Sequence, residues 1–187
     1  MQSVPELIAY AKANPGKLSY GSYGIGGNQH LAGEMLANMA GIRMVHVPYS
    51  SNQAMADLAS GRIQLMVHPY IAVEQLIKSG SLKAIGITSL SPVADLPNIR
   101  LVSETLPGYA VVGWGMLMAP AKTPQDVLQK LNSASVKALA GDQVRQTLAK
   151  QHMTTGTLSI ADSNEFMNAD WARWGKVVRE AKVPALS

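Results

Sequence analysis

The sequence predicts an α/β protein whose main part is a small, doubly wound lobe built around a parallel sheet. Segments of strand character alternate with helical segments of about ten residues, and glycine or proline ends most of them. Alternation of this kind produces βαβ units, in which parallel strands are joined by right-handed crossovers. The chain has 187 residues, of which 47% are hydrophobic, so it can bury a substantial core.

The first expected element is a helix over residues 3–14. Ser3 at the N-cap and Glu6 three positions later form a capping box, and Pro5 in the first turn favours a helix start. The run Asn14-Pro15-Gly16 contains two helix breakers and ends the segment.

Residues 17–88 then alternate between short strands and helices. The second helix carries Leu31, Met35 and Met39 four positions apart, which predicts a buried stripe. Ser50 or Ser51 is suited to cap the third helix. The expected strands are 17–20, 43–47, 63–67 and 82–88, with the helices between them and a fourth helix opening at His68-Pro69.

The pattern changes after residue 88. The expected elements are a helical turn near 102–106, an extended run over 109–119, and helices near 123–138, 142–151 and 163–181. An apolar face marks the last helix, and its Trp171 and Trp174 are expected to pack in a core. Three helices need a sheet to cover, yet this part of the chain supplies almost no strand.

Composition excludes several classes of function. The chain has no cysteine, which removes disulfides, thiol catalysis and cysteine-based metal sites. Its four histidines lack metal-binding spacing, so neither a metal nor a cofactor is expected. The net charge of +4 is scattered and there is one phenylalanine, so no nucleic-acid partner is expected. No segment reads as a signal peptide or a membrane span.

Three turns are expected at the carboxyl ends of successive strands, at 22–29, 49–52 and 68–70. Ligands of open α/β sheets bind in the crevice outside these ends, and each turn opens a helix with unpaired amides and a positive dipole end. The sequence therefore predicts a socket for an anion. The expected ligand-binding residues are Ser22, Tyr23, Gly24, Gly26, Gly27, Asn28, Ser51, Asn52 and His68.

The first turn is expected to hold a carboxylate on main-chain donors. The amides of Gly24, Gly26 and Gly27 would approach the ligand closely, while Ser22 and Asn28 add side-chain hydrogen bonds. The alternative is a glycine-rich connection shaped by turn geometry alone.

The histidines and the motifs favour binding over catalysis. His30 either reaches the ligand or caps its turn, His46 in mid-strand is expected to be structural, and His68 is the best functional candidate, with turn capping as its alternative. Ser22 lacks a nucleophile elbow, and the turns carry no paired carboxylates. Gln29 stands where a dinucleotide fingerprint requires its third glycine.

A series of motifs runs in order along essentially the whole chain. They are Asn14-Pro15-Gly16-Lys17-Leu18, Tyr20-Gly21-Ser22, Gly24-x-Gly26, His30-Leu31-Ala32-Gly33-Glu34, His46-Val47-Pro48-Tyr49, Leu96-Pro97-Asn98-Ile99, Leu106-Pro107-Gly108-Tyr109, Ala119-Pro120-x-x-Thr123-Pro124 and Arg173-Trp174-Gly175-Lys176-Val177-Val178. Together they resemble the solute-binding proteins of tripartite tricarboxylate transporters, also called the Bug-type family.

The resemblance implies an α/β, periplasmic-binding-protein-like fold whose two lobes close on a small carboxylic acid without an enzymatic step. It implies an inter-lobe helix at 1–16, one complete doubly wound lobe (the second) at 17–115, and the C-terminal part of the first lobe at 116–187. The N-terminal half of that first lobe, with its own ligand loop and the export signal, is expected to be missing. The chain alone is then expected to bind weakly or not at all, and to self-associate or exchange strands through the uncovered surface.

Two departures from the family pattern bear on ligand choice. After Tyr49 the family usually has Lys-Gly where this chain has Ser50-Ser51, and the third strand often ends in an aromatic and an acid rather than His68-Pro69-Tyr70. One charge near the pocket is lost, and His68 adds a pH-dependent donor. The implied function is a periplasmic receptor that delivers a small carboxylate to membrane transporter subunits. A nucleotide-binding α/β enzyme and a ligand-dependent partner of a membrane sensor remain as alternatives.

Overall fold

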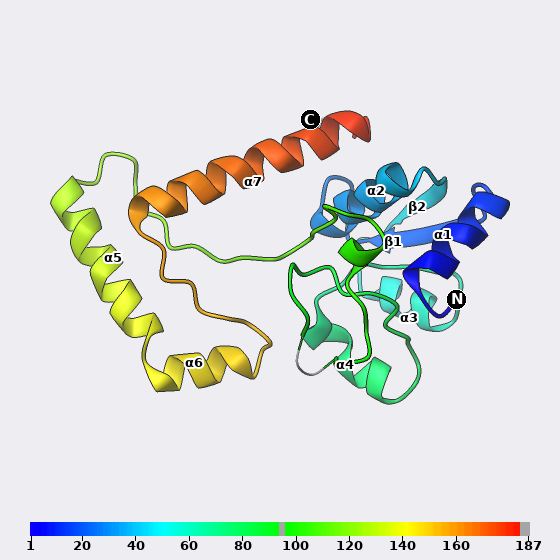
Figure 1. Cartoon of the computed structure of the whole chain (residues 1–187), viewed down its shortest axis with the longest axis horizontal. Helices are drawn as coiled ribbons and strands as arrows, with labels where there is room; N and C mark the ends of the chain where they lie inside the picture. The colour runs from blue at the N-terminus through cyan, green and yellow to red at the C-terminus, as the bar shows by residue number, and fades with distance from the viewer. Residues whose placement is uncertain (94–95, 184–187) are drawn as a thin grey trace. The chain divides into compact units, whose positions relative to one another are not determined.

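The computed structural model of the chain describes residues 1–93 and 96–183 (Figure 1). Contacts divide the chain into two compact units, unit 1 with Met1–Gly113 and Trp174–Ser187, and unit 2 with Trp114–Arg173. None of the helices in the described ranges is long and apolar enough to cross a membrane. The elements are α1 (Val4–Ala13), β1 (Leu18–Ser22), α2 (Asn28–Ala40), β2 (Met44–Pro48), α3 (Gln53–Ala59), α4 (Tyr70–Lys78), the 3₁₀ turn η1 (Val102–Glu104), α5 (Gln125–Leu139), α6 (Asp142–Ala149) and α7 (Ile160–Glu180).

The helix α1 begins as its capping residues predict. The Ser3 side chain accepts a hydrogen bond from the Glu6 amide at 3.4 Å, and the Glu6 carboxylate accepts one from the Gln2 amide at 2.8 Å. The first bond satisfies an amide that the first turn leaves without a helical acceptor, and the second ties the residue before the N-cap to the helix. Leu7 and Ala11 are each 1% exposed, so α1 packs into the core of unit 1.

The strands β1 and β2 form the parallel βαβ unit that the alternation predicts. Leu18 lies opposite Met44 and Ser22 opposite Pro48, with α2 as the crossover between the strands. Gly41 ends α2 with a left-handed φ of 61°, a conformation that glycine adopts without the strain a side chain would cause.

The expected third strand is reduced to a single bridge on the other side of β1. Leu65 forms an isolated parallel bridge with Tyr20. The Gly21 amide donates to the Leu65 carbonyl at 3.0 Å, and the Leu65 amide donates to the Ser19 carbonyl at 3.2 Å. A ladder needs consecutive pairs of this kind, so the segment runs beside β1 without becoming a full strand.

The expected fourth strand is reduced in the same way. Ile87 forms an isolated parallel bridge with Leu101, supported by a bond from the Val102 amide to the Ile87 carbonyl at 2.8 Å. The α/β character of unit 1 is therefore confirmed, while its regular sheet comprises two strands within the described residues.

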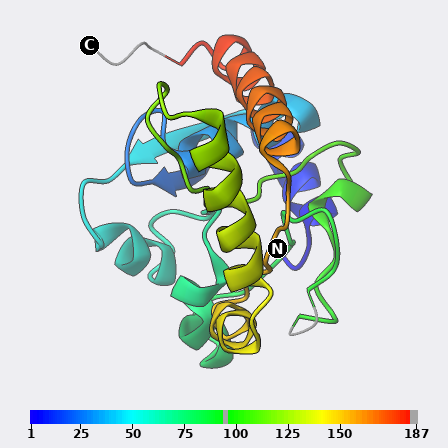
Figure 2. The same ribbon diagram turned by 90° about the vertical axis from the view of Figure 1, so that its left-hand side faces the viewer.

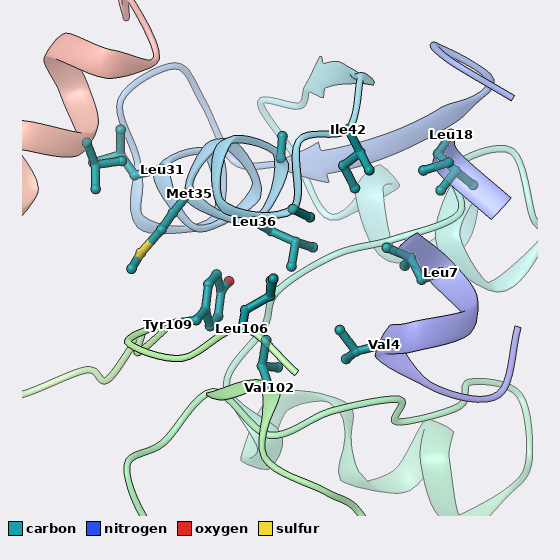
Figure 3. Packing of buried hydrophobic residues seen from close by; sticks show 14 residues of the cluster. Val4, Leu7, Leu18, Leu31, Met35, Leu36, Ile42, Val102, Leu106 and Tyr109 are labelled. Atoms are coloured by element: carbon teal, nitrogen blue, oxygen red, sulfur yellow. The ribbon is translucent and has the colours of Figure 1, made fainter. Parts of the chain in front are cut away.

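The core of unit 1 forms between α1, α2 and the segment around η1. Figure 3 shows Met35 and Leu36 of α2 facing Tyr109 and Leu106, with α1 contributing side chains from the other side. Tyr109 is 1% exposed, and its hydroxyl donates to the Ala32 carbonyl at 3.1 Å. The loop after residue 100 is thus fixed to α2 by both apolar contact and a buried hydrogen bond.

Two residues expected in the core lie outside it. Met39 is 38% exposed, because eight positions along a helix rotate a side chain by about 80° from Leu31. Trp171 is 82% exposed, whereas Val177, six positions further along α7 and part of unit 1, is 7% exposed.

Unit 2 has no core of its own. None of its residues 114–173, all of which the structure describes, is buried. Its helices α5 and α6 follow one another through a short connection (Figure 2), and no residue of either helix is buried. Trp114 donates to the Asp170 carboxylate at 2.9 Å and packs edge-on against Phe166. The apolar side chains of α5 and α6 therefore all remain at least partly exposed.

Candidate functional site

The three turns expected at the strand ends converge in unit 1. The turn between β1 and α2 contacts the second turn through a hydrogen bond from the Tyr49 amide to the Ser22 carbonyl, at 2.8 Å. It contacts the third turn through Tyr23, whose ring meets the His68 ring edge-on with centroids 5.7 Å apart. The first turn therefore lies against each of the other two, as expected for turns at one edge of a parallel sheet. This edge, formed by the turns at 22–29, 49–52 and 68–70, is called the rim.

The glycine amides of the first turn donate hydrogen bonds within the protein. The Gly26 amide donates to His30 Nδ1 at 2.9 Å, and the Gly24 amide donates to Ser22 Oγ at 3.2 Å. The Gly27 amide points to the Gly24 carbonyl at 3.4 Å. These three donors, which the sequence assigns to a carboxylate, are occupied because neighbouring side-chain and main-chain groups supply acceptors.

The open main-chain donors lie just beyond the glycines, at the start of α2. Within the described residues, the amides of Asn28, Gln29 and His30 have no protein acceptor, since the first helical bond runs from the Leu31 amide to the Gly27 carbonyl. Gly27 is the N-cap and has no side chain to satisfy them. Three orphan amides at the positive end of a 13-residue helix favour an anion.

The second turn is held by a carboxylate in α3. Asp57 accepts hydrogen bonds from the Tyr49 hydroxyl at 3.0 Å, from Gln53 at 2.9 Å and from Arg62 at 3.0 Å. The bond from Gln53, followed by those from Tyr49 and Arg62, lowers the pKa of Asp57. This carboxylate stays ionised at neutral pH and fixes the start of the turn.

Ser51 and Asn52 occupy the exposed end of the second turn. Ser51 Oγ accepts from the Gln53 amide at 3.4 Å, and the Asn52 carbonyl accepts from the Met55 amide at 3.1 Å. The N-cap of α3 is Asn52, and no side chain makes a capping hydrogen bond there, so the expectation that Ser50 or Ser51 caps this helix is wrong. Both predicted ligand residues face solvent near the rim.

The third turn contributes an unsatisfied histidine. Within the described residues, the Nε2 atom of His68 is buried and has no hydrogen-bond partner, while its Nδ1 lies 3.4 Å from the Pro69 carbonyl. A buried ring nitrogen without a partner costs free energy, so such a group calls for a ligand or a water. Because the His68 ring contacts Tyr23 of the first turn, this unsatisfied nitrogen lies at the rim.

Two further histidines lie beneath the first turn as a stacked pair. The rings of His30 and His46 have centroids 3.9 Å apart at an interplanar angle of 19°, and the Tyr20 ring stacks on His46 at 5.0 Å. Burial lowers the pKa of His30, although nearby Glu34 acts in the opposite direction. Burial and, secondarily, His30 lower the pKa of His46 to about 4. Both rings are therefore neutral at pH 7.

The contact between Ser22 and His46 was missed by sequence reasoning. His46 Nε2 lies 2.6 Å from Ser22 Oγ, although the residues are 24 positions apart. The strand register carries the missing signal, because Tyr20 lies opposite His46 and Ser22 shares the face of Tyr20 two positions on. The reading of His46 as structural missed its position directly under the predicted ligand turn.

This Ser–His pair lacks the geometry of a nucleophile and its base. Ser22 is 0% exposed, and its hydroxyl also bonds the amide and the carbonyl of Gly24. An activated serine instead stands exposed with an oxyanion site beside it. No cluster of three or more metal-ligating side chains occurs among the residues that the structure describes.

Comparison with known proteins identifies relatives over nearly the whole chain. The family model described as the tripartite tricarboxylate transporter family receptor matches residues 1–183. A protein from the tcbD-tcbE intergenic region of Pseudomonas sp. is 33% identical over 187 residues, covering 98% of this chain and 56% of its own length. A protein from the clcB-clcD intergenic region of Pseudomonas knackmussii is 36% identical over 163 residues, covering 83% of this chain and 94% of its own length.

Solved structures agree with this assignment. An R. palustris protein solved with adipate superposes with a TM-score of 0.83 at 29% identity, covering all of this chain and 63% of the other. The periplasmic binding protein BugD superposes with a TM-score of 0.78 at 28% identity, covering 98% of this chain and 62% of the other. These matches confirm the periplasmic-binding-protein-like α/β fold. The chain spans a little over half the length of the Pseudomonas sp. relative. Because the family model matches residues 1–183, the chain belongs to the tripartite tricarboxylate transporter receptor family.

Proposed function

We propose that this chain is the ligand-binding part of a periplasmic receptor that captures a small carboxylate for a tripartite membrane transporter. Membership of a receptor family and the likeness to a protein solved with adipate support this function over the nucleotide-enzyme alternative. The periplasmic location, the transporter subunits as partners, and the division into an inter-lobe helix, a complete lobe and part of another are included in the proposal.

The observation that carries the proposal is the row of open amides at the start of α2. Asn28, Gln29 and His30 present donors to an anion at the rim where the three turns meet. A carboxylate there gains charge-assisted bonds, and His68 Nε2 supplies a polar contact for the remainder of the ligand. Ser22 and the glycines shape the turn, while Tyr23, Ser51 and Asn52 border the site. A carboxylate held at one end by a partial receptor is expected to bind weakly.

Replacing Asn28 with proline tests this main-chain role. Proline removes one amide donor but is tolerated in the first turn of a helix, and Gly27 already has the extended conformation (ψ 163°) that a residue before proline prefers. We expect Asn28→Pro to weaken adipate binding about tenfold or more, because hydrogen bonds to charged groups are the strong ones. Amide shifts in ¹⁵N NMR during titration with adipate measure the affinity.

Asn28→Ala is the matched control, because it removes the side chain and keeps the amide. Adipamide, the uncharged analogue, is expected to cause no shift at residues 28–30. Equal affinity of the proline and alanine variants for adipate would contradict the proposed role of these amides.

The exposed apolar residues of unit 2 predict self-association of the isolated chain. Leu117 and Trp171 are each 82% exposed, Met118 is 72% exposed and Leu131 is 52% exposed. Apolar surface of this extent is rarely left in water, and in a pure preparation a second copy is the available partner. We therefore propose a dimer or larger assembly, or strand exchange, through unit 2.

Light scattering across a concentration series tests this assembly. The wild-type mass is expected to exceed that of one chain, and Trp171→Glu together with Leu131→Lys is expected to restore the monomer. Leu90→Ser is the control, because Leu90 is 78% exposed but belongs to unit 1. A wild-type chain that stays monomeric at the highest concentration would exclude self-association.

A further inference from the structure

Two histidines hold the ligand turn from beneath, each at a different point. His30 Nδ1 accepts the Gly26 amide at 2.9 Å. His46 Nε2 contacts Ser22 Oγ at 2.6 Å, and Ser22 Oγ in turn bonds the amide of Gly24 at 3.2 Å and its carbonyl at 3.0 Å. The turn between β1 and α2 is therefore tied to two stacked rings by side-chain contacts at its start and its middle.

The rings are themselves fixed by groups on three elements. On β1 the Tyr20 ring stacks against His46, with centroids 5.0 Å apart, and the Tyr20 hydroxyl donates to Glu34 of α2 at 2.5 Å. Glu34 lies 4.0 Å from His30 Nε2, and His46 comes from β2. The groups facing the pair are thus Tyr20, Ser22 and Glu34, and the rings face each other.

This geometry requires one protonation state of His30. A ring nitrogen that accepts an amide hydrogen carries no proton, so the neutral ring has its proton on Nε2, toward Glu34. A second proton on Nδ1 would oppose the Gly26 amide and place a positive charge beside the His46 ring, 3.9 Å away between centroids. Protonation therefore conflicts with the observed turn.

We propose that His30 and His46 are positioning residues, which hold the glycine turn in the shape that leaves the amides at the start of α2 open to a ligand. The inference rests on the proposed carboxylate site, and it assigns control of that site to the neutral state of the two rings. Acid protonates the rings, releases Gly26 and weakens carboxylate binding. Burial of both rings places this release below neutral pH, because it lowers the pKa of each.

The first test follows the turn without any ligand. In ¹⁵N NMR of the full chain, the Gly26 amide is expected to shift with pH in step with the His30 ring resonances and to exchange faster with water once the ring is protonated. In His30→Asn, whose amide oxygen replaces Nδ1 without titrating, Gly26 is expected to stay protected and to lose this pH dependence. In His30→Leu its protection is expected to disappear.

The second test measures binding of adipate as a probe. His30→Leu is expected to weaken adipate binding about tenfold at neutral pH, the effect of losing one buried hydrogen bond, whereas His30→Asn stays within about threefold. His46→Gln, which keeps a polar group at the Nε2 position, is likewise expected to stay within about threefold. The control is His152→Asn, a change in unit 2.

The two tests separate this inference from the proposed function. A Gly26 amide that ignores the His30 titration, or a His30→Leu variant that binds adipate like the wild type, would overturn the positioning role and leave the receptor assignment intact. Absence of adipate binding in every variant, with Gly26 still following His30, would count against the ligand proposal while supporting the positioning role.

Discussion

Replacing Gly33 with alanine is expected to destabilise unit 1 by about 2–3 kcal/mol, although alanine is the better helix former. Gly33 lies inside α2, where the Tyr20 ring packs directly on the helix backbone. A Cβ at this position would lie 2.2 Å from Tyr20 Cε2 and 2.5 Å from Cδ2, far inside van der Waals contact. Either the ring or the helix must move.

The Tyr20 ring cannot move aside without losing contacts. It is 1% exposed, donates to Glu34 at 2.5 Å and stacks on His46, so displacing it breaks contacts beneath the ligand turn as well. Urea unfolding followed by circular dichroism measures the loss. Beyond stability, the variant is expected to disturb the Gly26 amide.

Gly175→Ala is the matched control for this substitution. Gly175 also lies in a helix, but a Cβ there would meet the end of the Arg179 side chain at 3.3 Å, which can move aside. This change is expected to be neutral or to stabilise by up to about 1 kcal/mol through helix propensity. Equal effects of the two substitutions would show that Tyr20 does not require the glycine.

The parts of the fold that sequence predicts well depend on local signals. The start of α1 follows from Ser3 and Glu6, and the end of α2 follows from Gly41, because a cap or a left-handed residue acts within a few positions. Strand regularity is different, because it depends on the partner. Leu65 and Ile87 each find one bridge, and nothing in their own segments distinguishes one bridge from a ladder.

The candidate site divides in the same way. The convergence of the three turns could be predicted, because the ends of parallel strands meet at one edge. The identity of the open donors could not, since it depends on which side chains reach the glycine amides. The His30 ring accepts a hydrogen bond from the Gly26 amide, so the amides left without a protein acceptor are those at the start of α2.

Lowering the pH from about 7.5 to about 5 is expected to reduce the free energy of unfolding by roughly 1–2 kcal/mol through partly exposed His46, and His30 acts in the same direction. Burial lowers the pKa of His46 from 6.5 to about 4, and it also lowers that of His30. The unfolded chain therefore binds protons more readily than the native state. The stability from neutral rings is complete above about pH 6.5 and is lost as pH falls toward about 4.

The carboxylates change the free energy of unfolding in a lower pH range than the histidines do, so the two contributions can be measured separately. Hydrogen bonds lower the pKa values of Asp57 and Glu104, so their contributions are present above their ordinary pKa values of 3.8 and 4.5 and disappear below them. Urea unfolding between about pH 7.5 and 5 therefore reports mainly on the histidines. The double variant His30→Asn with His46→Gln is expected to show a much flatter pH dependence than the wild type.

The pH dependence of the free energy of unfolding also tests whether the stacked rings of His30 and His46 titrate as one unit. With rings 3.9 Å apart, a proton on one opposes a proton on the other, so each single variant should relieve part of the other ring's penalty. The two single variants are then expected to flatten the curve by amounts that do not add to the effect of the double variant. Additive effects would mean that the rings titrate independently, and an unchanged slope in the double variant would mean that the acid sensitivity of unit 1 arises elsewhere. The first outcome would still allow each ring to hold its own part of the turn, whereas the second would remove the acid switch from beneath the ligand site.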